Sequence, residues 1–458
     1  MNAKTSHVLL VMLFTVGVSL TFYKLDESPV TWMDEGLITQ TSRNLATQGR
    51  YAIQTAPGEF ASPGIISTSL PVTLPVALSY KIFGVGLLQA RVVMALYIIA
   101  FFILAYLLVR KHAGQSAALL GLALLVTFAP IYGHGKNVLG EVPGLVWLLF
   151  ALLTFKNPWS GIFFGLAMVT KPIFLLLLPA IAIVYVYKRE WPSRIFIASL
   201  ALPVLVWILV QFPHDAIGNI LSIYANPHHT NLWLSIVANA HRFITEAQPF
   251  YALILLGIWL LSLLWRWRAR VDIDKVELVA AVFSLFVYLA YLRTIGYYRY
   301  FFLGEVLALM YLPITLLRSN LERFPKVRPL IPACLILLVA IQFYQTSYHS
   351  WVASAYGSHR TRDLSAVLSQ LPPGKLVFVY QAPELANFLP SNNYLQYVKV
   401  AEDIIIGADN LPRAERGEPE LVLAHAEDAA LPIFSRYEIH TAFDQYMLMT
   451  KRWSIQSQ

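Results

Sequence analysis

Long apolar runs recur along this chain, and they constrain its fold more than any other feature. A helix of about 20 apolar residues is long enough to cross the hydrocarbon core of a bilayer. Only 13% of the residues are charged, against roughly 25% in soluble domains. The pattern predicts an α-helical polytopic membrane protein with about eleven transmembrane helices. The expected spans are residues 7–23, 87–109, 115–132, 138–155, 159–170, 172–187, 193–211, 249–265, 275–293, 300–317 and 328–345.

Basic residues test this span count, because short cytoplasmic loops of membrane proteins are enriched in Lys and Arg. With the N-terminus inside, every loop expected inside is basic, and one missing span would invert all later loops. The first run is expected to stay as a span, since no good signal-peptidase site follows it. The chain fits a bacterial inner membrane, with an archaeal membrane as the alternative. The basic loops are Arg110-Lys111, Lys156, Lys188-Arg189 with Arg194, Arg266 to Arg270, and Arg318 to Arg328.

The net charge of +8 does not indicate a nucleic-acid partner, because the basic residues fall in these short loops. The single cysteine, Cys334, excludes an intrachain disulfide.

Two parts of the chain are expected on the outer, extracytoplasmic side. The first is the long loop 24–86, in which residues 70–83 have the composition of a helix lying in the membrane interface. The second is residues 346–458, where strand-like pieces at 376–380 and 420–423 and a helix-like piece at 363–370 predict a small α/β domain. The predicted division is thus a transmembrane module, 1–345, and an outer domain, 346–458.

Three carboxylates on the outer side are candidates for chemistry. Asp34 and Glu35 follow the first apolar run in the sequence Trp-Met-Asp-Glu-Gly, and Glu141 opens the fourth run. A carboxylate at the mouth of a membrane cavity can act as a general base or a metal ligand. The alternatives are solvated loop acids for the pair, and a carboxylate favoured by the helix dipole for Glu141.

Three cations are expected on the same side. Lys171 interrupts the fifth and sixth runs, Arg299 follows two tyrosines, and Arg91 lies early in the second run. A lysine there can hold a phosphate as a point charge, and arginine among aromatic residues suits an anionic headgroup or a sugar. The alternatives are a snorkelling lysine and arginines that anchor an aromatic belt.

Sequence motifs for other chemistries are missing. His228 and His229 are adjacent, and no HExxH or CxxC pattern accompanies them. A divalent metal is left open, with no metal ligand indicated. The chain also has no Walker loop, no dinucleotide-binding glycine pattern and no Gly-x-Ser-x-Gly, so nucleotide-driven chemistry has no support.

The order of these features resembles a known superfamily. The acidic pair is followed by Leu78 to Gly84, Arg91, Gly140 to Pro143, Gly165 to Pro172, and Arg299-Tyr300. Over residues 1–320 this resembles the GT-C membrane glycosyltransferases, in particular the bacterial protein-mannosyltransferase and aminoarabinose-transferase-like group, families 39 and 83. An outer C-terminal domain is also usual there.

The resemblance implies an inverting glycosyltransferase that takes a hexose or pentose from a polyprenyl-phosphate donor. It implies that Asp34 is the base, that Glu35 supports it or orients the acceptor, and that Glu141 is the second acid of the cavity. Lys171, Arg299 and Arg91 would bind the donor phosphate. Many relatives have a tyrosine three positions after the acidic pair, where this chain has Ile38, so the acceptor side is expected to differ.

Two other functions stay open at this point. A lipid-linked glycan transporter or flippase would carry charges in the centres of its spans and paired repeats. A polysaccharide polymerase or ligase would carry a large late outer loop, for which residues 212–248 are a candidate. The acceptor, whether glycan, lipid or protein, is not indicated by the sequence.

Overall fold

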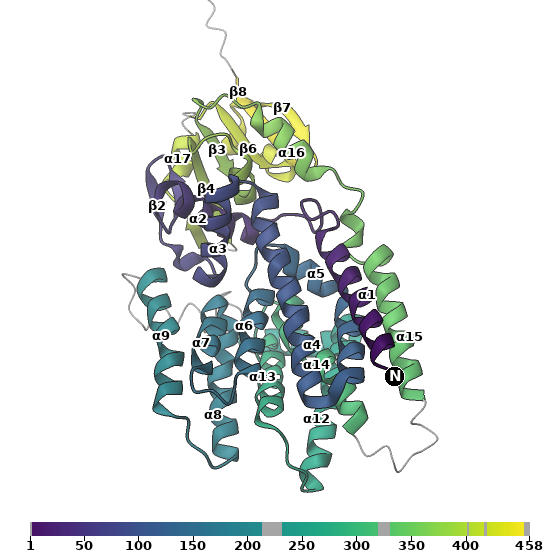
Figure 1. The fold of residues 1–458 in the computed structure, drawn as a ribbon. Coiled ribbons are helices and arrows are strands. Elements are labelled where there is room, and N and C mark those ends of the chain that lie inside the picture. The colour runs from purple at the N-terminus through teal and green to yellow at the C-terminus, as the bar shows by residue number, and fades with distance from the viewer. Residues whose placement is uncertain (1, 213–230, 319–329, 401–402, 416–418, 453–458) are drawn as a thin grey trace, which may run out of the picture.

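The computed structural model describes residues 2–212, 231–318, 330–400, 403–415 and 419–452. Its helices form a bundle, and a domain that contains a β-sheet lies over one end of this bundle (Figure 1). We call this end the outer face and the other end the opposite face.

The bundle is built from the predicted apolar runs, each of which falls on a helix. Large apolar side chains from these helices form one continuous buried core. The helices are α1 (Ala3–Phe22), α4 (Leu87–Val126), α5 (Ala129–Lys136), α6 (Glu141–Leu153), α7 (Ser160–Thr170), α8 (Leu177–Tyr187), α9 (Arg194–Gln211), α11 (Leu232–Thr245), α12 (Ala247–Arg268), α13 (Lys275–Tyr291), α14 (Arg299–Arg318) and α15 (Leu330–Tyr344).

The multi-pass membrane character is clear, but the count of eleven spans is not confirmed. Among the described residues, six helices are long and apolar enough to cross a membrane, and a seventh span results if the bent pair α5 and α6 counts as one. Helix α4 carries two of the predicted runs, because Gly114, with φ of 81°, breaks its 40 residues into two helices. Helices α7 and α8 are apolar but short.

Two of the loops that were predicted inside, those after α8 and α12, meet at the opposite face. Lys188 lies 2.6 Å from Asp272, and Lys275 pairs with Glu190. These residues come from the loops after α8 and α12, whose ends lie furthest from the sheet in Figure 1. The agreement between loop charge and position supports the predicted sidedness of these segments.

The long loop between α1 and α4 is largely ordered into secondary structure. It contains α2 (Met33–Gln48), the hairpin strands β1 (Ile53–Ala56) and β2 (Glu59–Ala61), and α3 (Leu70–Phe83). The predicted helix at residues 70–83 is thus present. Its Leu74, Leu78 and Ile82 are exposed at a spacing of four residues, which puts them on one face of the helix.

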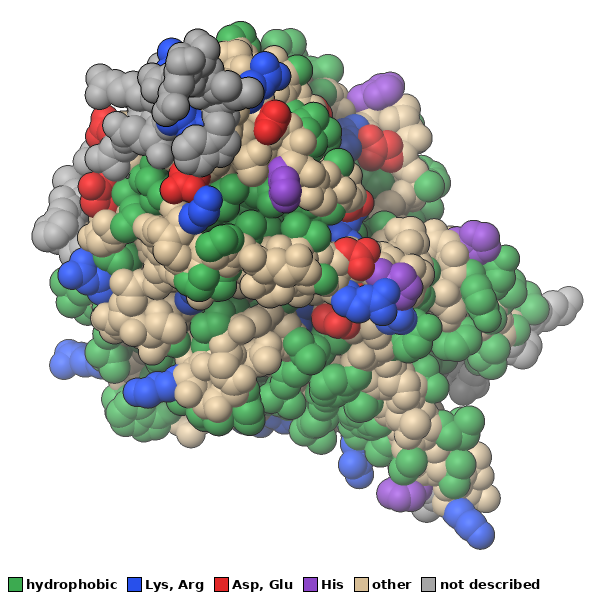
Figure 2. All heavy atoms as spheres, turned by 90° about the horizontal axis from the view of Figure 1, so that it is seen from above, with side chains coloured by type: hydrophobic (Ala, Val, Ile, Leu, Met, Phe, Trp, Pro, Cys, Tyr) green, Lys and Arg blue, Asp and Glu red, His purple; other side chains and the backbone are tan. Residues whose placement is uncertain are grey.

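The predicted α/β domain is confirmed in its class. Its sheet has six strands in the order β5-β4-β3-β6-β8-β7, and only the β3–β4 and β3–β6 pairs are parallel. The strands are β3 (Val377–Tyr380), β4 (Tyr394–Val400), β5 (Asp403–Ile406), β6 (Leu421–His425), β7 (Tyr437–Phe443) and β8 (Tyr446–Lys451), and the helices are α16 (Arg360–Ser369) and α17 (Asn410–Glu415). Seen from the outer face, acidic and basic side chains are interspersed over this domain (Figure 2).

The outer loop and the C-terminal domain share their cores. Leu37, Ile38 and Ile53 are buried together with Val398 and Ile406. The side chain of Gln54 in β1 donates to the carbonyl of Asn392 at 2.7 Å. The two segments therefore form one outer layer, although the residues in contact, such as Gln54 and Asn392, are 338 positions apart in the sequence. The division of the chain at residue 345 stays a prediction.

Candidate active site

The acidic pair lies in the first turn of α2, a 16-residue helix, and not in an irregular loop. A carboxylate in the first turn is favoured by the helix dipole. Neighbouring residues on an α-helix point about 100° apart. The two carboxylates therefore meet different partners.

Asp34 pairs with Arg299, the first residue of α14. Arg299 Nη1 lies 2.5 Å from Asp34 Oδ2, and the side chain of Arg299 is 12% exposed and that of Asp34 24% exposed. The guanidinium of Arg299 also lies over the rings of Trp32, at 4.7 Å, and Tyr300, at 5.4 Å. These aromatic rings hold Arg299 beside Asp34. Of the three predicted acids, only Asp34 keeps appreciable exposure to solvent.

Glu141 pairs with Lys171, and both are buried. Glu141 is the first residue of α6, and Lys171 lies in the extended link after α7. Gly140, which directly precedes Glu141, allows the two segments to approach closely. A Cβ at this position would lie 2.7 Å from the carbonyl oxygen of Thr170. The beginning of α6 and the link after α7, which carry these two residues, therefore pack directly against each other.

The two ion pairs form one cluster of charges. Glu141 interacts electrostatically with Arg299 as well as with Lys171, and Lys171 interacts with both Arg299 and Asp34. The cluster combines two carboxylates and two cations on the outer-domain side of the helix bundle. Such a group can hold an anionic ligand on its cations and accept a proton on a carboxylate.

Glu35 and Arg91 lie apart from this cluster, in a fully buried pair. Arg91 donates from Nε to Glu35 Oε1 at 2.9 Å and from Nη2 to Oε2 at 2.7 Å, and both side chains are 0% exposed. The remaining groups of Arg91 donate to the carbonyl of Leu25 and to Asn137, and Glu35 accepts from the amide of Val138. With every face occupied by protein, Arg91 presents no surface to a donor phosphate and Glu35 none to an acceptor.

Two polar residues of this region were missed in the sequence. His134 of α5 lies against Tyr298, Phe302 and Trp351, and it interacts electrostatically with Glu141, Lys171 and Arg299. Three buried atoms of the region have no hydrogen-bond partner among the described residues: His134 Nε2, Glu141 Oε2 and Arg299 Nε. Unsatisfied buried polar atoms are rare and indicate a place for a ligand or water.

Glu305 is the second missed residue. This residue of α14 accepts hydrogen bonds from Gln248, at 2.6 Å, and from Tyr298, which directly precedes the helix. A signal did exist in the sequence, because a carboxylate within an apolar run is expensive and usually has a partner. His134 gave no comparable signal, since it falls in a Gly- and Pro-rich stretch that predicted only a turn.

The outer domain holds α2 in place through the short helix η6 (Pro383–Phe388). A Cβ at Gly36 would lie 2.4 Å from the backbone of Glu384, so only glycine allows this approach. Asn387 donates to the carbonyl of Gly36 at 3.2 Å, and Gln40 donates to the carbonyl of Pro383 at 3.1 Å. The helix that carries Asp34 is thus positioned by the C-terminal domain.

The structure identifies no metal ligands in the part of the chain that it describes. No group of three or more His, Cys, Asp or Glu side chains within it is arranged to hold an ion. His228 and His229 lie outside the described residues.

The fold is similar to that of solved membrane glycosyltransferases of the class that the sequence resemblance implied. Among solved structures, ArnT from Cupriavidus metallidurans bound to undecaprenyl phosphate matches with a TM-score of 0.62 and 16% identity, over 97% of this chain and 98% of that one. The Archaeoglobus fulgidus oligosaccharyltransferase in complex with Zn and sulfate matches with a TM-score of 0.57 and 12% identity, over 92% and 68%. The same archaeon's AglB with an inhibitory peptide and a dolichol-phosphate matches at 0.54 and 11%, over 98% and 74%. No family model and no curated protein matches the sequence.

Proposed function

We propose that this protein is an inverting glycosyltransferase that moves a sugar, a hexose or pentose, from a polyprenyl-phosphate donor to an acceptor. The carrying observation is the cluster of Asp34, Arg299, Glu141 and Lys171 on the outer-domain side of the bundle. The fold supports the donor class, because the ArnT structure holds undecaprenyl phosphate and the AglB structure a dolichol-phosphate. We propose a bacterial inner membrane, with the cluster on the periplasmic side.

Lys171 and Arg299 are the proposed phosphate ligands. The leaving group of the reaction is a lipid phosphate, and negative charge builds up on its bridging oxygen as the sugar departs. Cations placed at that oxygen before the reaction stabilise the transition state more than the bound donor. The unpartnered Nε of Arg299 is one donor that the phosphate can use.

Asp34 is the proposed general base. Its partner Arg299 is shared, because the phosphate and Asp34 compete for one guanidinium. When the donor phosphate binds Arg299, it draws the guanidinium away from Asp34 and leaves this carboxylate free to accept a proton from the acceptor.

The transfer step then balances without a nucleotide. The hydroxyl or amine of the acceptor gives its proton to Asp34, and its lone pair forms the new bond at the anomeric carbon. The bond from that carbon to the phosphate oxygen breaks, and polyprenyl phosphate leaves with the electron pair. Attack opposite to the leaving group inverts the anomeric centre. Glu141 holds Lys171 in position during this step.

The proposal is tested with Asp34→Asn in purified full-length protein. We expect the variant to fold, to bind the donor, and to lose roughly 10²–10⁴-fold in the release of polyprenyl phosphate, which is the usual contribution of a general base. The control is Asp444→Asn, which breaks a surface ion pair with Arg360 in the outer domain and should leave turnover unchanged. Wild-type turnover in Asp34→Asn, with a panel of lipid-phosphate sugars as donors, would refute the assignment.

A further inference from the structure

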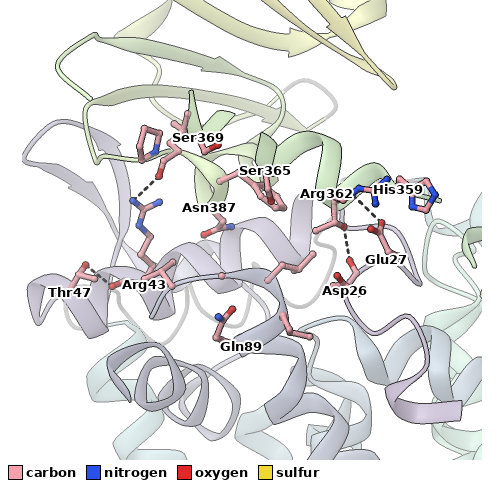
Figure 3. A pocket seen from close by; sticks show the side chains of 18 of the residues that line it. Asp26, Glu27, Arg43, Thr47, Gln89, His359, Arg362, Ser365, Ser369 and Asn387 are labelled. Carbon is pink, nitrogen blue, oxygen red and sulfur yellow. Dashed lines mark hydrogen bonds between the residues drawn. The ribbon is translucent and has the colours of Figure 1, made fainter. Parts of the chain in front are cut away.

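A cavity of about 910 Å³ lies between the outer domain and the helices beneath it (Figure 3). Its walls come from the turn after α1, from α2, from the beginning of α4, from α16 and from the segment that follows η6. The labelled side chains of Arg43, Asn387, Gln89 and Arg362 lie around the open space in Figure 3.

This cavity is separate from the Asp34 cluster. Arg43 and Thr47 of α2 line it, whereas Asp34, Arg299, Glu141 and Lys171 do not. Arg43 follows Asp34 by nine residues, which at about 100° per residue places the two on opposite sides of the helix. A molecule in the cavity therefore touches the face of α2 that points away from the proposed reaction.

Arg43 is a buried cation without a carboxylate partner among the described residues. Its Nη1 donates to the carbonyl of Ala386 at 2.7 Å and its Nη2 to the carbonyl of Leu389 at 3.4 Å. Burial lowers the pKa of its guanidinium, and the hydroxyl groups of Tyr394 and Tyr80 oppose this only in part. A buried charge that is balanced only by carbonyl dipoles is costly, and an anion in the cavity would compensate it.

Other lining groups extend this chemistry. Lys24 and Arg362 bring two more cations, from the turn after α1 and from α16. Of the two lining acids, Glu27 is occupied by accepting the amide of Thr361 at 3.1 Å, and Asp26 is the other. Hydroxyl and amide groups complete the polar wall, in Ser365, Ser369, Asn387, Asn392 and Thr47.

Apolar side chains form one part of the cavity wall. Val85, Leu87 and Leu88 line it at the start of α4. They directly follow α3 in the chain, whose Leu78 and Ile82 are exposed on one face. A helix with an exposed apolar stripe beside a membrane lies at the level of the headgroups.

We propose that this cavity binds the phosphate-bearing, hydroxyl-rich headgroup of a membrane amphiphile, whose hydrocarbon chain lies along α3. Arg43, Lys24 and Arg362 hold the phosphate, and the serine and asparagine side chains hold the hydroxyl groups. This site is a second lipid site, independent of the transfer reaction. The bound lipid ties the outer domain to the helix that carries Asp34.

The test measures binding to the full-length protein in zwitterionic detergent by native mass spectrometry and calorimetry. The three ligands are dihexanoyl phosphatidylglycerol, dihexanoyl phosphatidylcholine and inorganic phosphate. We expect saturable binding of phosphatidylglycerol, weaker binding of phosphate and none of phosphatidylcholine. Equal affinity for phosphate and for phosphatidylglycerol would overturn the lipid part of the proposal, and no saturable binding of either would overturn all of it.

Variants locate the binding. Arg43→Gln should weaken phosphatidylglycerol binding roughly tenfold or more, as expected for a lost bond to a charged group. Arg362→Gln, at a side chain that is 69% exposed, folds readily and should weaken it about two- to fivefold. Leu78→Ser should weaken binding of the lipid but not of phosphate, and Arg436→Gln on the exposed surface should change neither. Unchanged binding in both Arg43→Gln and Arg362→Gln would refute the site.

Asp34→Asn separates this proposal from the proposed function. It should leave phosphatidylglycerol binding unchanged, so each proposal can fail without the other.

Discussion

Replacing Arg91 by methionine removes the cation from the buried pair with Glu35. The change deletes four hydrogen bonds, two of them to the carboxylate. It also leaves Glu35, which is 0% exposed, without its counter-charge. Breaking a buried ion pair on one side costs about 3–5 kcal/mol of unfolding free energy. Adding Glu35→Gln should recover much of the loss, because no uncompensated charge then remains in the interior.

A second buried pair provides the control. Arg266 and Glu277 link α12 to α13, and both side chains are buried. Arg266→Met should lower stability by a similar amount. The pair lies among the loops of the opposite face, so the sugar-transfer rate of the protein that remains folded should not change. Arg91→Met should lower that rate as well, because it loosens α4 from the first turn of α2.

Stability is measured by titrating protein in mild detergent with a denaturing detergent and following tryptophan fluorescence, and transfer is measured by release of polyprenyl phosphate. If Arg91→Met changes the unfolding free energy by less than about 0.5 kcal/mol, as neutral surface changes do, the pair does not hold these helices together. If Arg91→Met keeps full stability but binds the donor more weakly, Arg91 binds the donor phosphate, as the sequence resemblance implied.

Two further predictions concern the contact between α2 and η6. Gly36→Ala should lower the unfolding free energy by about 1–3 kcal/mol and reduce transfer, because the new Cβ would lie 2.4 Å from the Glu384 backbone. The control is Gly257→Ala, where a new Cβ would have nothing within 4 Å. Equal effects of the two substitutions would contradict the close contact. Burial raises the pKa of Glu384 above its ordinary value of 4.5, although a hydrogen bond from Tyr446 opposes this. The folded protein therefore keeps a proton that the unfolded chain has lost, so this group's contribution to stability is present at acidic pH and falls as the pH rises. Glu384→Gln should make unfolding free energy less dependent on pH, measured between pH 5 and 8, and an unchanged slope would refute the role of this carboxyl.

The sequence predicted on which side of the membrane each candidate residue lies, but not which partner its side chain faces. Loop charge and span order placed Asp34, Glu141, Lys171 and Arg299 on one side, and the structure brings these four together. The same reasoning grouped Glu35 with Asp34, although one helical step turns it to a different partner. Adjacent residues cannot be assigned a shared role until their secondary structure is known.

Helix α2 itself was not predicted, for a physical reason. Its sequence from Thr39 to Asn44 is polar, and apolar periodicity is the main signal of a helix. Here these polar residues are buried, and two of them bond to the C-terminal domain: Gln40 donates to the side chain of Gln396 at 2.6 Å, and Arg43 donates to the carbonyl of Ala386 at 2.7 Å. Such partners are set by tertiary structure and leave no local pattern.

The contact between Gly36 and η6 also has a consequence for biosynthesis. Asn387 follows Gly36 by 351 residues, so at 5–20 residues per second α2 waits roughly 20–70 s for its partner to be made. Throughout that interval the polar face of α2 has nothing to cover it. The C-terminal domain must be synthesised and must reach the outer face before α2 can complete its packing. A chain cut short in this domain would keep its membrane helices and yet never assemble the Asp34 cluster.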